Sequence, residues 1–145
     1  MKKILLLFVV LFVFAPAKAA SSEFEQNYET AIQYKKDADY QKAVKFFLKA
    51  LKEKEADKDL AQSLCFEISD CFLKAGDEKS ALKFVKVAVR NYGATRNDIK
   101  SSSVLNEGFV LSVETVMNIE YNELHREYLI KNHQLSKAEY AELMR

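Results

Sequence analysis

The residues of this chain that could take part in chemistry are two histidines, two cysteines and the carboxylates near them. His125 and His133 are eight positions apart, which is about 12 Å along a helix, so they could not hold one metal ion without a break between them. His125 also lacks the second histidine four positions on that a helical zinc-protease motif uses. Surface histidines are therefore the preferred interpretation, with a hydrolase that pairs His125 with a carboxylate such as Glu120 as an alternative.

The cysteines, Cys65 and Cys71, are six positions apart within one expected helix. That spacing separates them by about 9 Å along the helix axis, beyond the ~7 Å that a disulfide tolerates between Cα atoms. We expect two small buried apolar side chains, with a bridge between two chains as an alternative. Since the sequence has no glycine-rich phosphate loop, no nucleophile elbow and no paired-cysteine zinc pattern, we expect no catalysis, no cofactor and no metal.

Length and composition fit one folded domain. The chain has 145 residues, 49% hydrophobic and 30% charged, with three glycines and one proline, which excludes collagen-like and low-complexity classes and favours helices. Lys and Arg total 22 against 21 Asp and Glu. Nucleic acid is therefore not an expected partner, because duplex binding depends on a concentrated cationic face.

Residues 1–19 have the pattern of a secretory signal peptide. Lys2 and Lys3 precede an apolar run over residues 4–14, and Ala17 and Ala19 stand three and one positions before the expected cut. As a helix the run spans roughly 16 Å, about half of a ~30 Å hydrocarbon core. We expect residues 20–145 to be released without a stable membrane span, into the periplasm or outside the cell, with a formal charge of −2 after three lysines are lost from the +1 of the whole chain.

Two segments after the expected cut, 24–34 and 40–51, have apolar residues at helical spacing. Ser22 and Glu25 have the spacing of a capping box, and Asp39 is placed to cap the second helix. The connection over residues 36–39 is so short that the two helices must lie antiparallel and bury their apolar faces on each other.

The same layout returns 38 residues later. Asp59 is expected to open a helix, and Ala75-Gly76-Asp77 turns the chain into the next one. Identical pairs at this offset include Asp39/Asp77, Ala43/Ala81, Lys45/Lys83, Phe46/Phe84 and Ala50/Ala88. Tyr34/Phe72 is a close replacement. The agreement of turn, small residues and aromatics indicates a duplicated helix pair.

These residues resemble the tetratricopeptide repeat family. The positions that carry the resemblance in the first repeat are Ala31, Tyr34, Ala38-Asp39-Tyr40, Ala43, Phe47 and Ala50. In the second repeat they are Ser69, Phe72, Gly76-Asp77, Ala81, Val85 and Ala88. The resemblance implies an all-α fold of antiparallel helix hairpins, stacked as a short solenoid with repeats at about 24–55 and 60–93. The period of 38 is longer than the family's 34, and the additional residues fit in the charged stretch 53–58.

The last third is expected to form C-terminal capping helices over about 99–145. Apolar residues from Ile99 to Tyr128 follow steps of three and four, which predicts one long helix or two joined near Gly108. Residues 105–121 also alternate between apolar and polar, so a strand remains an alternative there. Tyr92-Gly93 is expected to end a helix, residues 94–103 to be partly loop, and Ser136 with Glu139 to open a short terminal helix.

The resemblance also implies a protein or peptide partner bound on a concave face. The first helix of each hairpin would line that face with Tyr28, Ile32, Lys35, Lys36, Phe66, Asp70, Leu73 and Lys74. Alternatively, the C-terminal helices cover these side chains as core. The preferred function is an exported scaffold or adaptor of the cell envelope without catalysis, and the alternative is a self-associating accessory subunit, with a homo-oligomer possible in either case.

Overall fold

The structure, a computed structural model, describes residues 21–132 together with Ser136 and Ala138. All regular structure in this part of the chain is helical, which confirms the all-α prediction. The strand alternative for residues 105–121 is wrong, because residues 107–121 lie in a helix. The predicted signal peptide and the predicted terminal helix lie outside the described residues, Ser136 and Ala138 apart. The helices are α1 (Glu23–Lys36), α2 (Tyr40–Glu53), α3 (Lys58–Lys74), α4 (Glu78–Tyr92), α5 (Arg96–Lys100) and α6 (Glu107–Lys131).

The first four helices begin at side-chain caps. Ser22 and Glu25 form the predicted capping box at α1, and Asp39 accepts a hydrogen bond from the Lys42 amide at the start of α2. Asp77 caps α4 in the same way. The expected start of α3 at Asp59 is wrong: Asp57 is the cap, because its carboxylate accepts from the Leu60 amide at 3.2 Å and opens the helix one residue earlier.

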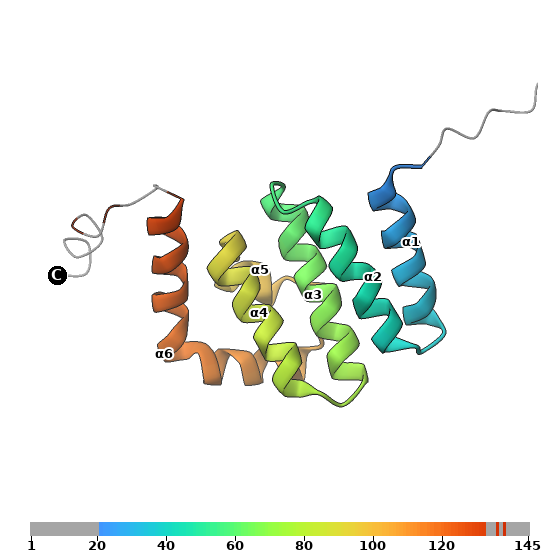
Figure 1. The fold of residues 1–145 in the computed structure, drawn as a ribbon. Helices are drawn as coiled ribbons and strands as arrows, with labels where there is room; N and C mark the ends of the chain where they lie inside the picture. Colours follow the sequence, from blue (N-terminus) through green and yellow to red (C-terminus); the bar gives the residue numbers. More distant parts are fainter. Residues whose placement is uncertain (1–20, 133–135, 137, 139–145) are drawn as a thin grey trace, which may run out of the picture.

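The chain reverses direction between consecutive helices from α1 to α4 (Figure 1). Contacts between α1 and α2 pair early residues with late ones, as when the Asn27 amide donates to the Glu53 carboxylate at 2.7 Å. The same holds for α3 and α4, where the Gln62 side chain donates to the Tyr92 carbonyl. These helices therefore give a helical, repeat-like arrangement.

The core is one cluster of apolar side chains shared by all six helices. Small residues lie where α1 packs on α2 and α3 packs on α4: Ala31, Ala43, Ala50, Ala81 and Ala88 have no exposed surface. Ala residues at such positions allow close approach of the helix axes, and the larger Phe47 and Val85 fill the space beside them.

In the part of the C-terminal third that the structure describes, two helices meet near Gly108, which is the second of the two predicted alternatives, and not one long helix. Thr95 and Asp98 form a capping box that opens the short α5 inside the stretch expected to be partly loop. Residues 101–106 then interrupt the helix, because the Ser102 hydroxyl accepts from the Val104 and Leu105 amides and Asn106 caps α6. The break falls just before Gly108, which lies in the first turn of α6.

Helix α6 packs on α4 and, unlike the earlier neighbours, runs in the same direction along it. Along the contact, the residue numbers increase on both helices: Glu78 contacts Ser112, Lys86 contacts Glu120 and Arg90 contacts Glu127. In Figure 1 α6 bends, so that its first part crosses the foot of α4 and its second part runs beside it. The connection through α5 is long enough to permit this parallel placement.

Candidate functional site

The eight predicted partner-binding residues are shared between α1 and α3, but their exposure differs. Lys36 and Lys74 are exposed, whereas Phe66 and Asp70 are buried. The remaining four are half-buried: Tyr28, Ile32, Lys35 and Leu73. Part of the predicted face is therefore accessible, and part is already occupied by contacts within the chain.

An ion-pair cluster joins α1 to α3 across this face. The Lys35 ammonium lies 2.7 Å from the Glu67 carboxylate and 2.6 Å from that of Asp70, and Lys74 pairs with Asp70 at 2.8 Å. The side chains of Lys35, Glu67 and Asp70 are only 16%, 14% and 6% exposed. Two lysines and two carboxylates thus neutralise one another in a partly dehydrated setting, where ion pairs are stronger than at an open surface.

The pKa values in the cluster follow from its contacts. Burial would lower the pKa of Lys35, but the hydrogen bonds that it donates to Asp70 and Glu67 raise it above its usual 10.5. Burial, with a smaller effect of the Glu67 charge, raises the pKa of Tyr28, against an opposing effect of Lys35. Lys35 therefore stays charged and Tyr28 stays a phenol at neutral pH.

Glu67 is the member of this cluster that sequence reasoning missed. It stands three positions before Asp70, on the same side of α3, and both carboxylates meet Lys35 of α1. The spacing of Glu67 and Asp70 was a usable signal, but only the packing of α3 beside α1 identifies their common partner.

Of the predicted face, Phe66 lies beside the C-terminal region. Its side chain is 6% exposed. It lies at a hollow of about 320 Å³ between α3 and the segment after α5, lined mainly by polar residues that include Asp59, Gln62, Ser63, Asp98 and Ser101 to Ser103. The accessible part of the predicted face is thus the end of α1 and α3 near Lys36 and Lys74.

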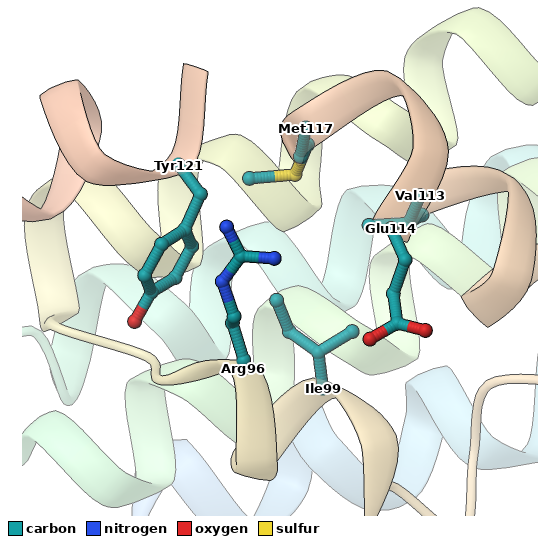
Figure 2. A pocket seen from close by; sticks show the side chains of 6 residues that line it. All are labelled: Arg96, Ile99, Val113, Glu114, Met117 and Tyr121. Atoms are coloured by element: carbon teal, nitrogen blue, oxygen red, sulfur yellow. The ribbon is translucent and has the colours of Figure 1, made fainter. Parts of the chain in front are cut away.

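A second hollow lies between α5 and α6 and is drawn in Figure 2. It is lined by Arg96, Ile99, Val113, Glu114, Met117 and Tyr121, and its volume is about 10 Å³. This is room for one water molecule at most. The Arg96 guanidinium carbon lies 4.6 Å from the centre of the Tyr121 ring. This cation–π contact packs α5 against α6 beside the hollow.

His125 and the two cysteines pack against neighbouring side chains. His125 stacks on Tyr121 and Tyr128, with ring centres 5.5 and 6.1 Å apart, and burial lowers its pKa. His125 is half-buried, so only part of its ring lies at the surface, while His133 lies outside the described residues. Glu120, its proposed carboxylate partner, pairs with Lys86 of α4 instead.

Cys65 and Cys71 are fully buried and unpaired, as predicted. Burial raises the pKa of their thiols to about 12 and about 11, so neither is ionised near neutral pH. Among the described residues no group of three or more His, Cys, Asp or Glu side chains could hold a metal ion, and none of the described helices is long and apolar enough to cross a bilayer.

Comparisons with known proteins give no match: no protein-family model, no curated protein and no solved structure is similar to this chain.

Proposed function

We propose that this chain is an exported interaction module of the tetratricopeptide repeat type, a scaffold or adaptor of the cell envelope without chemistry of its own. Residues 24–55 and 60–93 would form two stacked helix hairpins, and α5 and α6 would cap the second. A protein or peptide partner would bind the accessible end of the face formed by α1 and α3.

The observation that carries this proposal is the equivalence of two aromatic pairs 38 residues apart. Tyr34 and Phe46 stack with ring centres 5.5 Å apart and planes at 22°, and Phe72 and Phe84 stack at 5.7 Å and 20°. Two helix pairs that had arrived at their packing independently would not be expected to share this geometry at a fixed offset. The pairs support a duplicated unit, which is the basis of repeat architectures.

The connections inside the two pairs support the same interpretation. The Asp39 amide donates to the Tyr34 carbonyl at 2.9 Å, and the Asp77 amide donates to the Phe72 carbonyl at 2.8 Å. The residue before each aspartate has a positive φ, 59° at Ala38 and 79° at Gly76. One turn geometry is therefore used twice, even though only the second copy has the glycine that favours it.

The proposed partner surface combines apolar and cationic groups. Tyr28, Ile32 and Leu73 supply half-buried apolar surface, and Lys36 and Lys74 lie exposed beside it. Apolar anchors ringed by charge suit a helix or an extended peptide segment. Since Lys35 is already neutralised by Glu67 and Asp70, we expect apolar contacts to contribute more to affinity than charge.

The test is site-specific photo-crosslinking in cells that produce the full chain. A photoreactive amino acid replaces Lys36 or Lys74 on the proposed face, or Asn122 on the exposed side of α6 as a control. The proposal predicts that positions 36 and 74 capture the same protein and that position 122 does not. Capture that is equal at all three positions, or absent at 36 and 74, would contradict it.

A further inference from the structure

The outer face of α2 is a cationic surface that the near-zero net charge of the chain conceals. Four lysines, at steps of three and four, are exposed on the side away from the core: Lys42, Lys45, Lys49 and Lys52. The single carboxylate of α2, Glu53, accepts a hydrogen bond from Asn27 of α1. Because salt screens charges over about 8 Å, the local field depends on this face more than on the net charge.

Most of this positive charge is not neutralised within the chain. Lys42 pairs with Asp39, but Lys45, Lys49 and Lys52 form no ion pair with any of the described residues. Lys49 lies over the Phe46 ring instead, 4.8 Å from its centre. By contrast, several cations on other helices form ion pairs, among them Lys35, Lys86, Arg90 and Lys100.

Helix α4 repeats part of this lysine pattern. Lys83 is the counterpart of Lys45 at the 38-residue offset, and Lys79 precedes it by one turn; both are exposed and form no ion pair with the described residues. Because the contacts of α2 with α1 match those of α4 with α3, Lys45 and Lys83 hold equivalent positions. The two helices also run in the same direction in Figure 1.

We propose that this lysine face, defined as Lys45, Lys49, Lys52, Lys79 and Lys83, docks on an anionic lipid surface. The cations are all lysines, spread along two helices, with no arginine fork of the kind that fixes a carboxylate in a defined site. A field of flexible ammonium groups matches the delocalised charge of lipid phosphates. Leu48, 41% exposed beside Lys45 and Lys52, supplies an apolar side chain that can enter the headgroup layer.

Vesicle sedimentation of the full chain tests this proposal. The probes are vesicles of phosphatidylcholine alone and vesicles with a third of phosphatidylglycerol. The variant Lys45→Gln/Lys52→Gln removes two charges from the face, and Lys100→Gln/Lys131→Gln removes two exposed lysines outside both proposed surfaces. The apolar run of residues 4–14 is common to all chains, and thermal melts by circular dichroism verify that each variant is folded.

We expect the full chain to prefer the phosphatidylglycerol vesicles, and added salt to weaken this preference. The face variant should lose about 30-fold in affinity for them, the equivalent of about 1 kcal/mol per lysine, whereas the control variant should lose less than about 3-fold. Equal binding to both lipids, or equal losses in both variants, would overturn the proposal. Binding of soluble polyglutamate without binding of vesicles would also overturn it, in favour of an acidic protein partner. The partner surface on α1 and α3 is not involved, so either proposal can fail alone.

Discussion

At the scale of the residue, the two turns that join the helix pairs differ by one informative substitution. Ala38 and Gly76 occupy equivalent left-handed positions, with φ of 59° and 79°. A side chain pays a conformational penalty there that glycine avoids, roughly 1 kcal/mol or more. A Cβ at position 76 would meet no atom within 4 Å, so the effect of a substitution there is conformational and not steric.

We therefore predict opposite effects at the two positions. Gly76→Ala should lower the free energy of unfolding by about 1 kcal/mol, and Ala38→Gly should raise it by about 0.5 kcal/mol, because the added freedom of the unfolded chain offsets part of the gain. Urea denaturation followed by circular dichroism measures both changes. If Ala38→Gly destabilised the protein as much as Gly76→Ala, the two turns would not share one conformation.

The sequence predicted helix caps well, because a cap depends only on one side chain and a backbone amide a few residues away. The caps at Ser22 and Asp39 were predicted from type and position alone. Errors arose where two candidates competed: Asp57 and Asp59 both suit a cap, and the first one forms the hydrogen bond. Glu67 was missed because its role depends on Lys35, 32 positions earlier.

At the scale of the element, the Lys35 cluster holds α1 against α3. We predict that Lys35→Met lowers the free energy of unfolding by about 1 to 2 kcal/mol, since it leaves Glu67 without its partner and Asp70 with Lys74 alone. The neighbouring Lys36→Met, at an exposed position, should change it by less than about 0.5 kcal/mol. Equal effects of the two substitutions would mean that the cluster adds no stability.

The raised pKa of Lys35 also gives a pH dependence. Because the pKa of Lys35 in the folded chain lies above its usual 10.5, its contribution is fully present below pH 10.5 and is lost as the pH rises through the folded value. We predict that the stability difference between the native chain and Lys35→Met is constant from pH 7 to 9 and shrinks above about pH 10.5. Unfolding curves across this range measure it, and a difference that grew with pH would contradict the assignment.

The contact between α4 and α6 depends on Gly93. This residue ends α4 with φ of 74°, and a Cβ on it would lie 2.4 Å from the Tyr128 ring. We predict that Gly93→Ala destabilises the protein by about 1 kcal/mol more than Gly76→Ala, which shares the positive φ but has open space. In the Tyr128→Ala background this additional loss should disappear, as a double-mutant cycle would show. A loss that persists there would place its cause elsewhere than in the packing of α6.

At the scale of the whole molecule, the sequence predicted the helical class, because this class depends on local periodicity. The two equivalent pairs stay a prediction, which rests on a repeat visible in the chain. The sequence did not predict that α6 runs parallel to α4 or that the loop after α5 lies beside Phe66, although cover by the C-terminal helices was one alternative. Those arrangements result from a long connection and from contacts between distant residues. Only part of the predicted partner face is therefore accessible.

The net charge of the whole chain does not show how charge is distributed over its surface. Basic side chains concentrate on α2 and α4, whereas α6 carries five glutamates, at positions 107, 114, 120, 123 and 127. A near-neutral total argues against a cationic molecule, but not against a cationic face. The lysine face and the accessible end of α1 and α3 belong to different surfaces, so the proposed scaffold role and lipid docking are compatible.

The central claim is that one helix pair occurs twice. Nuclear Overhauser contacts between aromatic rings in the labelled protein test it most directly. The account predicts ring-to-ring contacts for Tyr34 with Phe46 and for Phe72 with Phe84, at similar intensity, in a spectrum with helical shifts within α1 to α4. Contacts in one pair without the other, or extended shifts in either half, would contradict it.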